Sequence, residues 1–221
     1  MDQNELKRRV ARAALDRVTE MVSPDSIIGV GTGSTTNFFI DLLAEFKSSF
    51  KATVSSSVAS TARIRDLGIS VLETHKVECA DIYVDGADEV DGSRALIKGG
   101  GGALTQEKIV VSISKYFLCI VDETKLVERL GTFPLPIEVI PSARSAVMRF
   151  TQSIGGKPSE RSRLTDNGNV IVDVAGLVID DPEEMEQTLN NLPGVVTAGI
   201  FALHRPHEVF VSKRDGSVAR L

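Results

Sequence analysis

The chain has 221 residues, of which 42% are hydrophobic and 25% are charged, and its formal net charge is −5. This length allows one large domain or two modest ones, and the composition is that of an ordinary globular protein. The negative charge, without any block rich in Lys and Arg, argues against a nucleic-acid-binding surface.

The first part of the chain alternates between helix-like and strand-like segments. Apolar residues recur at helical spacing over residues 3–21, and a short apolar strand follows at 27–30. We expect further strands at 52–54, 69–72, 82–84, 95–97 and 116–121, and further helices at 35–46, 60–67 and 104–114. Continuous apolar strands that alternate with helices indicate a parallel sheet covered on both faces. Ligands of such sheets bind beyond the carboxyl ends of the strands, where the glycine-rich segments of this chain lie.

The pattern changes after Pro134-Leu135-Pro136. Strands are expected at 137–140, 158–164, 169–174 and 195–201, and helices at 142–154 and from 181. The order β-α-β-β-α-β is that of a ferredoxin-like split unit. Asp166-Asn167-Gly168 is typical of a hairpin turn, and Asp181-Pro182 is a favourable helix start. A last hairpin near 208–217 can return to the first domain.

The N-terminal residues lack the apolar segment of a signal peptide, and no apolar run approaches the roughly 20 residues that span a bilayer. Cys79 and Cys119 lie in or beside apolar runs, where we expect reduced thiols of a reducing compartment. The sequence therefore predicts a soluble, cytoplasmic protein without a membrane partner.

The first candidate site is Gly-Val-Gly-Thr-Gly-Ser-Thr-Thr at 29–36, between a strand and a helix. Backbone N–H groups and hydroxyls at a helix N-terminus favour a phosphate group. The segment has neither the lysine of a P-loop nor the third glycine of a dinucleotide fingerprint, and the second strand ends in Ser55-Ser56-Ser57 instead of an acid. A small phosphate ester is therefore favoured over a nucleotide. A plain capped turn remains the alternative, both here and at the three serines, where Ser60 can be the cap.

The second candidate is Asp85-Gly86-Ala87-Asp88-Glu89-Val90-Asp91, directly after a strand. Its acids do not alternate as in a calcium loop, so we predict no metal. Asp85 and Asp88 are expected to face a ligand, and Glu89 and Asp91 to be solvated. A polar turn is the simpler alternative.

The third candidate is Lys98 followed by four glycines at 99–102 and by Glu107 in the first turns of a helix. Burial would raise the pKa of a carboxyl group that the helix dipole otherwise keeps ionised, and Glu107 would then be a competent base. Lys98 and the glycine N–H groups would stabilise negative charge on oxygen. An ordinary turn with a Glu107–Lys108 surface pair is the alternative. His204 and His207 are expected to belong to a plain loop, not to a metal site.

Together, in this order, these segments resemble those of the A-type ribose-5-phosphate isomerases. Further similar segments are Leu-Thr-Gln-Glu-Lys at 104–108, Phe-Pro-Leu-Pro-Ile-Glu-Val-Ile-Pro at 133–141 and Thr-Asp-Asn-Gly-Asn at 165–169. The resemblance covers nearly the whole chain. It implies interconversion of ribose 5-phosphate and ribulose 5-phosphate in the non-oxidative pentose phosphate pathway, with neither a metal nor an organic cofactor.

The resemblance also implies a fold: an α/β protein with a Rossmann-like parallel-sheet domain, 1–132 plus 206–221, and a smaller ferredoxin-like α+β lid domain, 133–205. A homodimer is expected, with a tetramer as the alternative. One departure is visible, because Gly102 stands where the family often has alanine. We expect this change to loosen the loop without removing the function.

The resemblance assigns roles to individual residues. Glu107 matches the proton-abstracting base, and Asp85, Asp88 and Lys98 are the other expected catalytic residues. The expected substrate-binding residues also include Thr32, Gly33, Ser34, Thr35, Gly86, Ala87, Gly99, Gly100, Gly101, Lys125 and Lys7. Among these, the resemblance places Ser34, Thr35 and Lys125 at the phosphate, with Lys7 assisting.

Two other function classes stay open. Sugar-phosphate deaminases and CoA transferases have a similar broad fold, but Asp85, Asp88 and Lys98 beside Glu107 fit neither chemistry as well. A non-catalytic sugar-phosphate sensor would keep the phosphate loop without a base. The chain has no apparent helix-turn-helix, and Glu107 is present, which disfavours a sensor.

Overall fold

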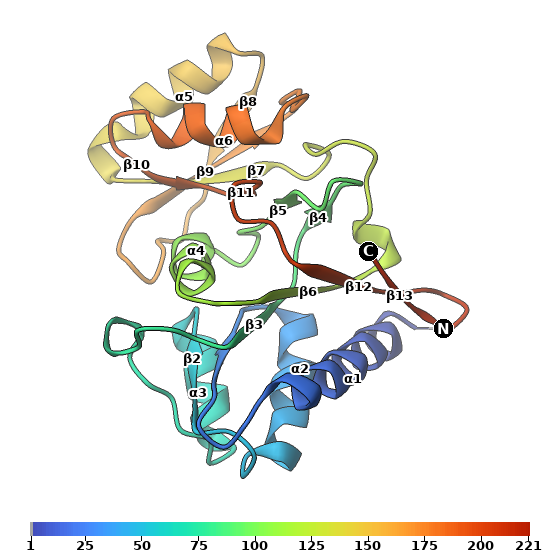
Figure 1. Cartoon of the computed structure of the whole chain (residues 1–221). Coiled ribbons are helices and arrows are strands. Elements are labelled where there is room, and N and C mark those ends of the chain that lie inside the picture. The colour runs from blue at the N-terminus through green and yellow to red at the C-terminus, as the bar shows by residue number, and fades with distance from the viewer. Residues whose placement is uncertain (1) are drawn as a thin grey trace. The chain divides into compact units, whose positions relative to one another are not determined.

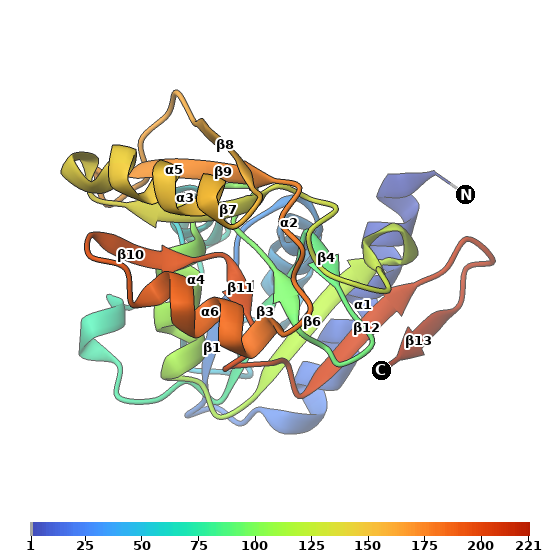
Figure 2. The same cartoon turned by 90° about the horizontal axis from the view of Figure 1, so that it is seen from above.

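The computed structural model describes residues 2–221, which divide into two compact units. The first unit comprises the residues up to Gly86, Gln106–Thr124 and Pro206–Leu221, and the second comprises Ala87–Thr105 and Lys125–Arg205. Figures 1 and 2 show the elements of the two units.

The first unit is built on a six-stranded sheet with the order β13-β12-β6-β3-β1-β2. Its strands are β1 (Ile27–Val30), β2 (Ala52–Ser55), β3 (Ile82–Asp85), β6 (Phe117–Asp122), β12 (Glu208–Ser212) and β13 (Val218–Arg220). All neighbouring pairs are parallel except β12–β13, the C-terminal hairpin, which forms one edge. The parallel sheet predicted from continuous apolar strands is confirmed.

Helices cover this sheet because each presents an apolar face to it. They are α1 (Gln3–Met21), α2 (Ser34–Leu43), α3 (Val58–Asp66) and α4 (Leu104–Ser112), with short 3₁₀ turns η1 (Ala44–Phe46), η2 (Thr74–Lys76) and η3 (Glu123–Lys125). Helix α1 packs on β6 and β12 and against α2 (Figure 1). Its buried residues Val10, Ala14 and Val18 join strand residues such as Ile28 in one apolar cluster.

The second unit contains a four-stranded antiparallel sheet with the order β10-β7-β9-β8. Its elements are β7 (Leu135–Val139), η4 (Pro141–Ala143), α5 (Arg144–Ser153), β8 (Lys157–Glu160), β9 (Val170–Ala175), α6 (Pro182–Asn190) and β10 (Val195–Ala198). When the four strands are numbered in chain order, their order across the sheet is 4-1-3-2, and α5 and α6 cover the same face (Figure 2). The ferredoxin-like β-α-β-β-α-β arrangement is confirmed.

A three-stranded sheet completes the second unit. It consists of β4 (Glu89–Val90), β5 (Leu96–Ile97) and β11 (Ile200–Phe201), in the order β11-β5-β4. The predicted strand 195–201 is therefore divided between two sheets at Gly199. This residue must be glycine, because a Cβ atom there would lie 2.3 Å from the carbonyl oxygen of Lys98.

Other expectations differ in detail. The predicted strand 69–72 is only an isolated bridge between Thr53 and Val71. Helix α3 is capped by Ser57, whose Oγ accepts a hydrogen bond from the Ser60 N–H, and not by Ser60. Residues 87–105 and 125–132, predicted for the first domain, group with the second unit. The division into independently folding domains stays a prediction.

Candidate active site

Asp85, the last residue of β3, holds the loop that follows β1. These two strands are parallel neighbours, so their carboxyl ends meet at one edge of the sheet. The fully buried Asp85 carboxylate accepts hydrogen bonds at Oδ1 from the N–H groups of Thr32 (3.0 Å) and Gly86 (2.7 Å) and from Thr36 Oγ1 (3.2 Å). Its Oδ2 accepts a bond of 2.5 Å from the hydroxyl group of Tyr83. One carboxylate thus fixes both ends of the Thr32–Thr36 segment.

The same loop requires glycine where it passes Asp85. A Cβ atom on Gly31 would lie 1.8 Å from Asp85 Cγ, so no other residue fits without displacing the carboxylate. Gly33, with φ at +130°, precedes α2, which begins at Ser34. Exposed Ser34 and half-buried Thr35 therefore occupy the first turn of a helix, where N–H groups and the helix dipole attract anions.

The serine segment after β2 is tied to this loop. Thr32 Oγ1 and Ser56 Oγ are 2.8 Å apart, and Ser60 Oγ donates a 2.8 Å hydrogen bond to the carbonyl oxygen of Gly31. These contacts support a structural role for the serines, which hold the loop after β1 in place.

Glu107 lies in the first turn of α4 and is only 3% exposed. The pKa of Tyr83 lies well above its ordinary value, because of burial first and then the negative charges of Asp85 and Glu107. The buried Tyr83 hydroxyl group is therefore subject to the negative charge of both carboxylates, and all three groups belong to the first unit. Buried carboxylates of this kind are candidate groups for proton transfer.

The second unit contains Asp88, Lys98 and the glycine loop. Lys98 follows β5 directly and is only 2% exposed, with its Nζ 5.6 Å from the centre of the Phe201 ring. Asp88 Oδ2 accepts a 2.8 Å hydrogen bond from the N–H group of Gly100. A Cβ atom on Gly100 would lie 2.7 Å from Asp88 Oδ1, so only glycine allows this approach.

Comparisons with known proteins identify the family. A sequence model described as ribose 5-phosphate isomerase A (phosphoriboisomerase A) matches residues 52–216. A curated protein of Bordetella bronchiseptica named ribose-5-phosphate isomerase A is 54% identical over 98% of this chain and 96% of its own length. The chain belongs to the ribose-5-phosphate isomerase A family. This family interconverts ribose 5-phosphate and ribulose 5-phosphate, so the resemblance seen in the sequence is confirmed.

Solved structures of the ribose-5-phosphate isomerase A family agree with the fold. The enzyme from Neisseria gonorrhoeae has a TM-score of 0.93 and 43% identity, covering 100% of this chain and 97% of that one. A D-ribose-5-phosphate isomerase in complex with phospho-erythronic acid also has a TM-score of 0.93, with 40% identity, and covers 100% of this chain and 99% of that one.

Some predicted site residues lie elsewhere than expected or remain untested. Glu89 was expected to be solvated, but it is 3% exposed and accepts hydrogen bonds from the N–H groups of Gly131 (2.7 Å) and Phe133 (2.5 Å). It is therefore structural. Lys7 on α1 and Lys125 at the end of η3 are both half-buried, and their contact with phosphate stays a prediction.

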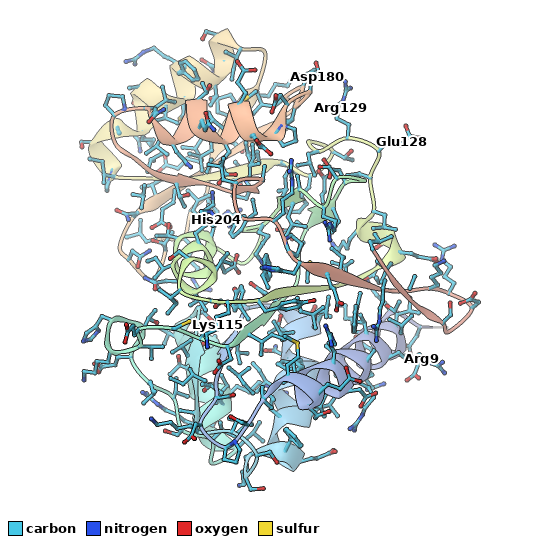
Figure 3. All side chains as sticks on the ribbon, in the orientation of Figure 1. Arg9, Lys115, Glu128, Arg129, Asp180 and His204 are labelled. Atoms are coloured by element: carbon cyan, nitrogen blue, oxygen red, sulfur yellow. The ribbon has the colours of Figure 1, made fainter. Side chains whose placement is uncertain are left out.

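The histidines support the loop interpretation. His204 is exposed (Figure 3), and His207 Nδ1 accepts a 3.0 Å hydrogen bond from the N–H group of Phe117. Within residues 2–221, no group of three or more His, Cys, Asp or Glu side chains is arranged to hold a metal ion. No helix in the same range is long and apolar enough to cross a membrane.

Sequence reasoning missed Tyr83, Glu138 and Arg161. Tyr83 could have been found, because residues two apart on a strand share a face and Tyr83 stands two before Asp85. Glu138 stands in the family-like segment 133–141, but its partners, like the glycine partners of Arg161, lie far away along the chain, so the local sequence indicates the role of neither residue.

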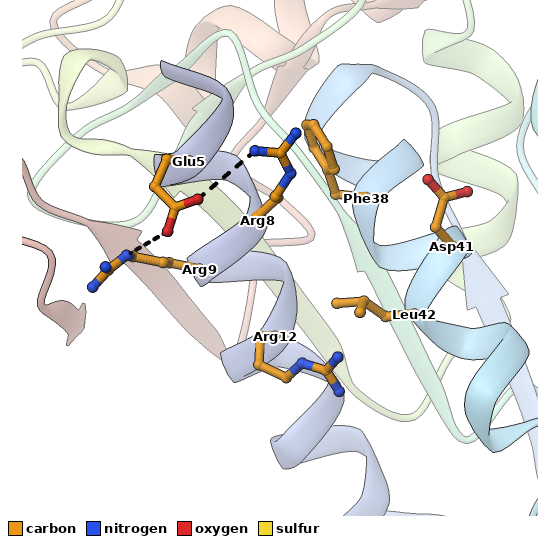
Figure 4. Close-up of a pocket in the computed structure, with 7 residues that line it drawn as sticks. All are labelled: Glu5, Arg8, Arg9, Arg12, Phe38, Asp41 and Leu42. Carbon is orange, nitrogen blue, oxygen red and sulfur yellow. Dashed lines mark hydrogen bonds and ion pairs between the residues drawn. The ribbon is translucent and has the colours of Figure 1, made fainter. Parts of the chain in front are cut away.

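A groove of about 570 Å³ lies between α1 and α2 in the first unit (Figure 4). Its three arginines are already paired, since Arg8 and Arg9 contact Glu5 at 3.7 and 3.0 Å and Arg12 contacts Glu45 at 3.3 Å. No predicted site residue lines the groove, and we assign it no function.

Proposed function

We propose that this chain interconverts D-ribose 5-phosphate and D-ribulose 5-phosphate through an enediolate, with Glu107 as the base. The observation that carries the proposal is the buried Glu107 carboxylate in the first turn of α4, directly after the glycine loop. It occurs in a chain that belongs to the ribose-5-phosphate isomerase A family. The reaction needs a proton to leave carbon while charge develops on oxygen, and a buried base that follows a glycine loop with backbone N–H donors in the chain suits both needs.

In this mechanism Glu107 removes the proton from C2 of the open-chain aldose and returns it to C1. The electron pair left on C2 forms the C1–C2 double bond of the enediolate, and O1 takes the negative charge. Lys98 and the N–H groups of the loop Gly99–Gly101 stabilise that charge. Transfer of the O2 proton to O1 and return of the abstracted proton from Glu107 to C1 then give the ketose, with no net change in atoms or overall oxidation state.

The two aspartates have different surroundings, which supports different roles. Asp85 already accepts four hydrogen bonds that order the loop after β1. We assign it to substrate positioning and to assisting ring opening. Asp88, half-buried in the second unit beside Gly100, is the better candidate to move protons between O1 and O2.

The phosphate is proposed to bind at the N-terminus of α2, where Thr32–Thr35 supply N–H groups and hydroxyls, with Lys125 and Lys7 as cations. Gly86 and Ala87 line the substrate beside Asp85. No metal or organic cofactor takes part.

We further propose a cytoplasmic homodimer, with a tetramer as the alternative that sedimentation equilibrium would distinguish. The support is the expectation from the family resemblance.

The test is Glu107→Gln, which keeps the shape of the side chain but removes its basicity. We expect the turnover of ribose 5-phosphate to fall by roughly 10³-fold or more, with binding of the sugar phosphate retained. Glu128→Gln, at an exposed position (Figure 3), is the matched control and should keep full activity.

Undiminished turnover in Glu107→Gln would overturn the assignment of the base. Wild-type binding without turnover would favour a sensor, whereas release of ammonia from an amino-sugar phosphate or a glutamyl-CoA adduct would favour the other enzymes. Loss of wild-type activity with EDTA would contradict the metal-free mechanism.

A further inference from the structure

Arg161, a side chain with no role in the proposed mechanism, holds the glycine loop of the second unit. Arg161, which follows β8, donates hydrogen bonds from Nη1 to the carbonyl oxygens of Gly99 (3.0 Å) and Gly100 (3.2 Å). Both acceptors belong to the loop whose N–H groups are proposed to stabilise the enediolate.

These two contacts determine where the loop directs its N–H groups. In a planar trans peptide the C=O and N–H groups point in opposite directions. Because Arg161 holds the carbonyl groups of Gly99 and Gly100, the N–H groups that follow them, on Gly100 and Gly101, point away from it. The 2.8 Å hydrogen bond from the Gly100 N–H to Asp88 is on that opposite side.

Arg161 is itself fixed by an ion pair on the neighbouring strand. Its Nε and Nη2 donate to the two carboxylate oxygens of Asp173 on β9, at 2.8 and 2.5 Å. The two side chains are only 23% and 21% exposed. A bidentate pair in partly buried surroundings fixes a guanidinium group well, which leaves Nη1 directed at the loop.

The loop needs such an external anchor, because four consecutive glycines have little conformational preference of their own. Within the loop, the Gly102 N–H donates to the Gly99 carbonyl oxygen at 3.0 Å, which closes a single turn. A guanidinium group at the carbonyl ends also polarises the peptide groups, so their N–H groups become stronger donors.

We propose that Arg161 is a positioning residue for the isomerase reaction: it holds the carbonyl groups of Gly99 and Gly100 so that the Gly101 N–H group is directed at the developing oxyanion and the Gly100 N–H group at Asp88. Asp173 holds Arg161 in place. The inference rests on the proposed function, since it deepens the role of the glycine loop there.

The experiment compares Arg161→Met with the wild type in steady-state kinetics, in thermal unfolding and in the binding of phospho-erythronic acid. This compound carries a phosphate and, in place of the enediolate, a carboxylate. We expect kcat to fall about 10²-fold while KM changes by less than about threefold, because the loss affects the transition state. The affinity for phospho-erythronic acid should fall by a similar factor to kcat, whereas that for ribose 5-phosphate in a Glu107→Gln background should not.

Three further variants separate positioning from stability. Asp173→Asn leaves Arg161 present but weakens its anchor, so it should lower kcat in the same direction by a smaller factor. Arg161→Lys retains a cation and should recover part of the loss. Arg144→Met removes a more exposed ion pair, between Arg144 on α5 and Glu160 on β8 at 2.8 Å, and should lower thermal stability slightly without changing kcat.

The proposal is overturned if Arg161→Met lowers only the unfolding temperature, or if KM rises as much as kcat falls. If Arg161→Met does not fold, unchanged kcat in Asp173→Asn overturns it. If the wild type showed no isomerase activity, the proposed function would fail, while the affinity for phospho-erythronic acid would still report whether Arg161 orients the loop.

Discussion

Tyr83 and Asp85 satisfy each other's buried polar groups in this site. The two stand on one face of β3, and the 2.5 Å hydrogen bond between them is fully buried. Asp85 can order the loop after β1 only if its other oxygen is also satisfied, because an unpaired buried carboxylate oxygen is costly. The tyrosine supplies that partner without adding a charge.

This contact gives a pH dependence. The pKa of Tyr83 is raised above its ordinary value of about 10, since burial and the nearby charges of Asp85 and Glu107 disfavour a phenolate. In the unfolded chain the phenol ionises near pH 10, so its contribution to stability is complete below that pH and declines as the pH rises further. We expect the free energy of unfolding to fall more steeply above pH ~10 in the wild type than in Tyr83→Phe.

Absorbance of the phenolate provides the direct measurement, because the chain has two tyrosines and no tryptophan. Folded wild type and folded Tyr83→Phe should titrate alike up to about pH 11, and should differ only after unfolding in denaturant. A phenolate signal in the folded wild type that exceeds the signal of Tyr83→Phe near pH 10 would contradict the assignment.

At the scale of elements, the sequence predicted best where a local pattern determines the structure. Helix α1 was predicted with its observed bounds, residues 3–21, because its apolar spacing is regular and long. Strand β4 was missed, since two residues carry no periodicity, and the bridge at Val71 was overestimated as a strand. The strand at 195–201 was predicted as one, because nothing local indicates that Gly199 must pass against the Lys98 carbonyl.

The residues of the candidate site show the same contrast between local patterns and contacts distant in the chain. Asp85, Lys98, the glycines and Glu107 were found because they stand in short motifs at strand ends. Arg161 and Glu138 were missed because their partners lie 61–62 and 27–33 residues away along the chain. Such contacts exist only once β7, β8 and β9 have paired, and no single-sequence pattern contains that register.

Glu138 on β7 connects two other segments of the second unit. Its fully buried carboxylate accepts hydrogen bonds from Thr105 at the start of α4 (2.5 Å) and from Thr165, Asn167 and Asn169 in the turn before β9 (2.8–3.0 Å). Glu138→Gln replaces one acceptor with a donor at constant volume, so buried donors would face a donor. We expect a loss of roughly 2 kcal/mol in the free energy of unfolding, measured by urea denaturation.

Glu160→Gln on β8 is the control for this change, because that glutamate is 40% exposed and pairs only with Arg144 in a half-exposed contact. It should cost less than about 1 kcal/mol. Equal stability of Glu138→Gln and the wild type would show that the buried carboxylate does not organise these two segments.

For the whole molecule, the chain passes between the two units at residues 86–87, 105–106, 124–125 and 205–206. The apolar cluster of the second unit contains Ala95 and Ile97 from the segment around β5, and Leu130, together with the residues of the four-stranded sheet. The segment 133–205 predicted as a lid therefore lacks three buried members of its own core. It also lacks β5, the strand that pairs with β11.

This deficit predicts that residues 133–205 alone do not fold cooperatively. Burying one large aliphatic side chain contributes about 1.5–3 kcal/mol, so losing Ile97 and Leu130, together with the smaller Ala95, removes several kcal/mol, a large share of a typical domain's stability of about 5–15 kcal/mol. A chain that joins 87–105 to 125–205 through a long Gly/Ser linker restores all three and the pairing of β5 with β11. Circular dichroism in urea should show a sigmoidal transition for the joined chain and none for 133–205. A cooperative transition of equal midpoint in both would instead support the lid as an independent domain with the bounds predicted from the sequence.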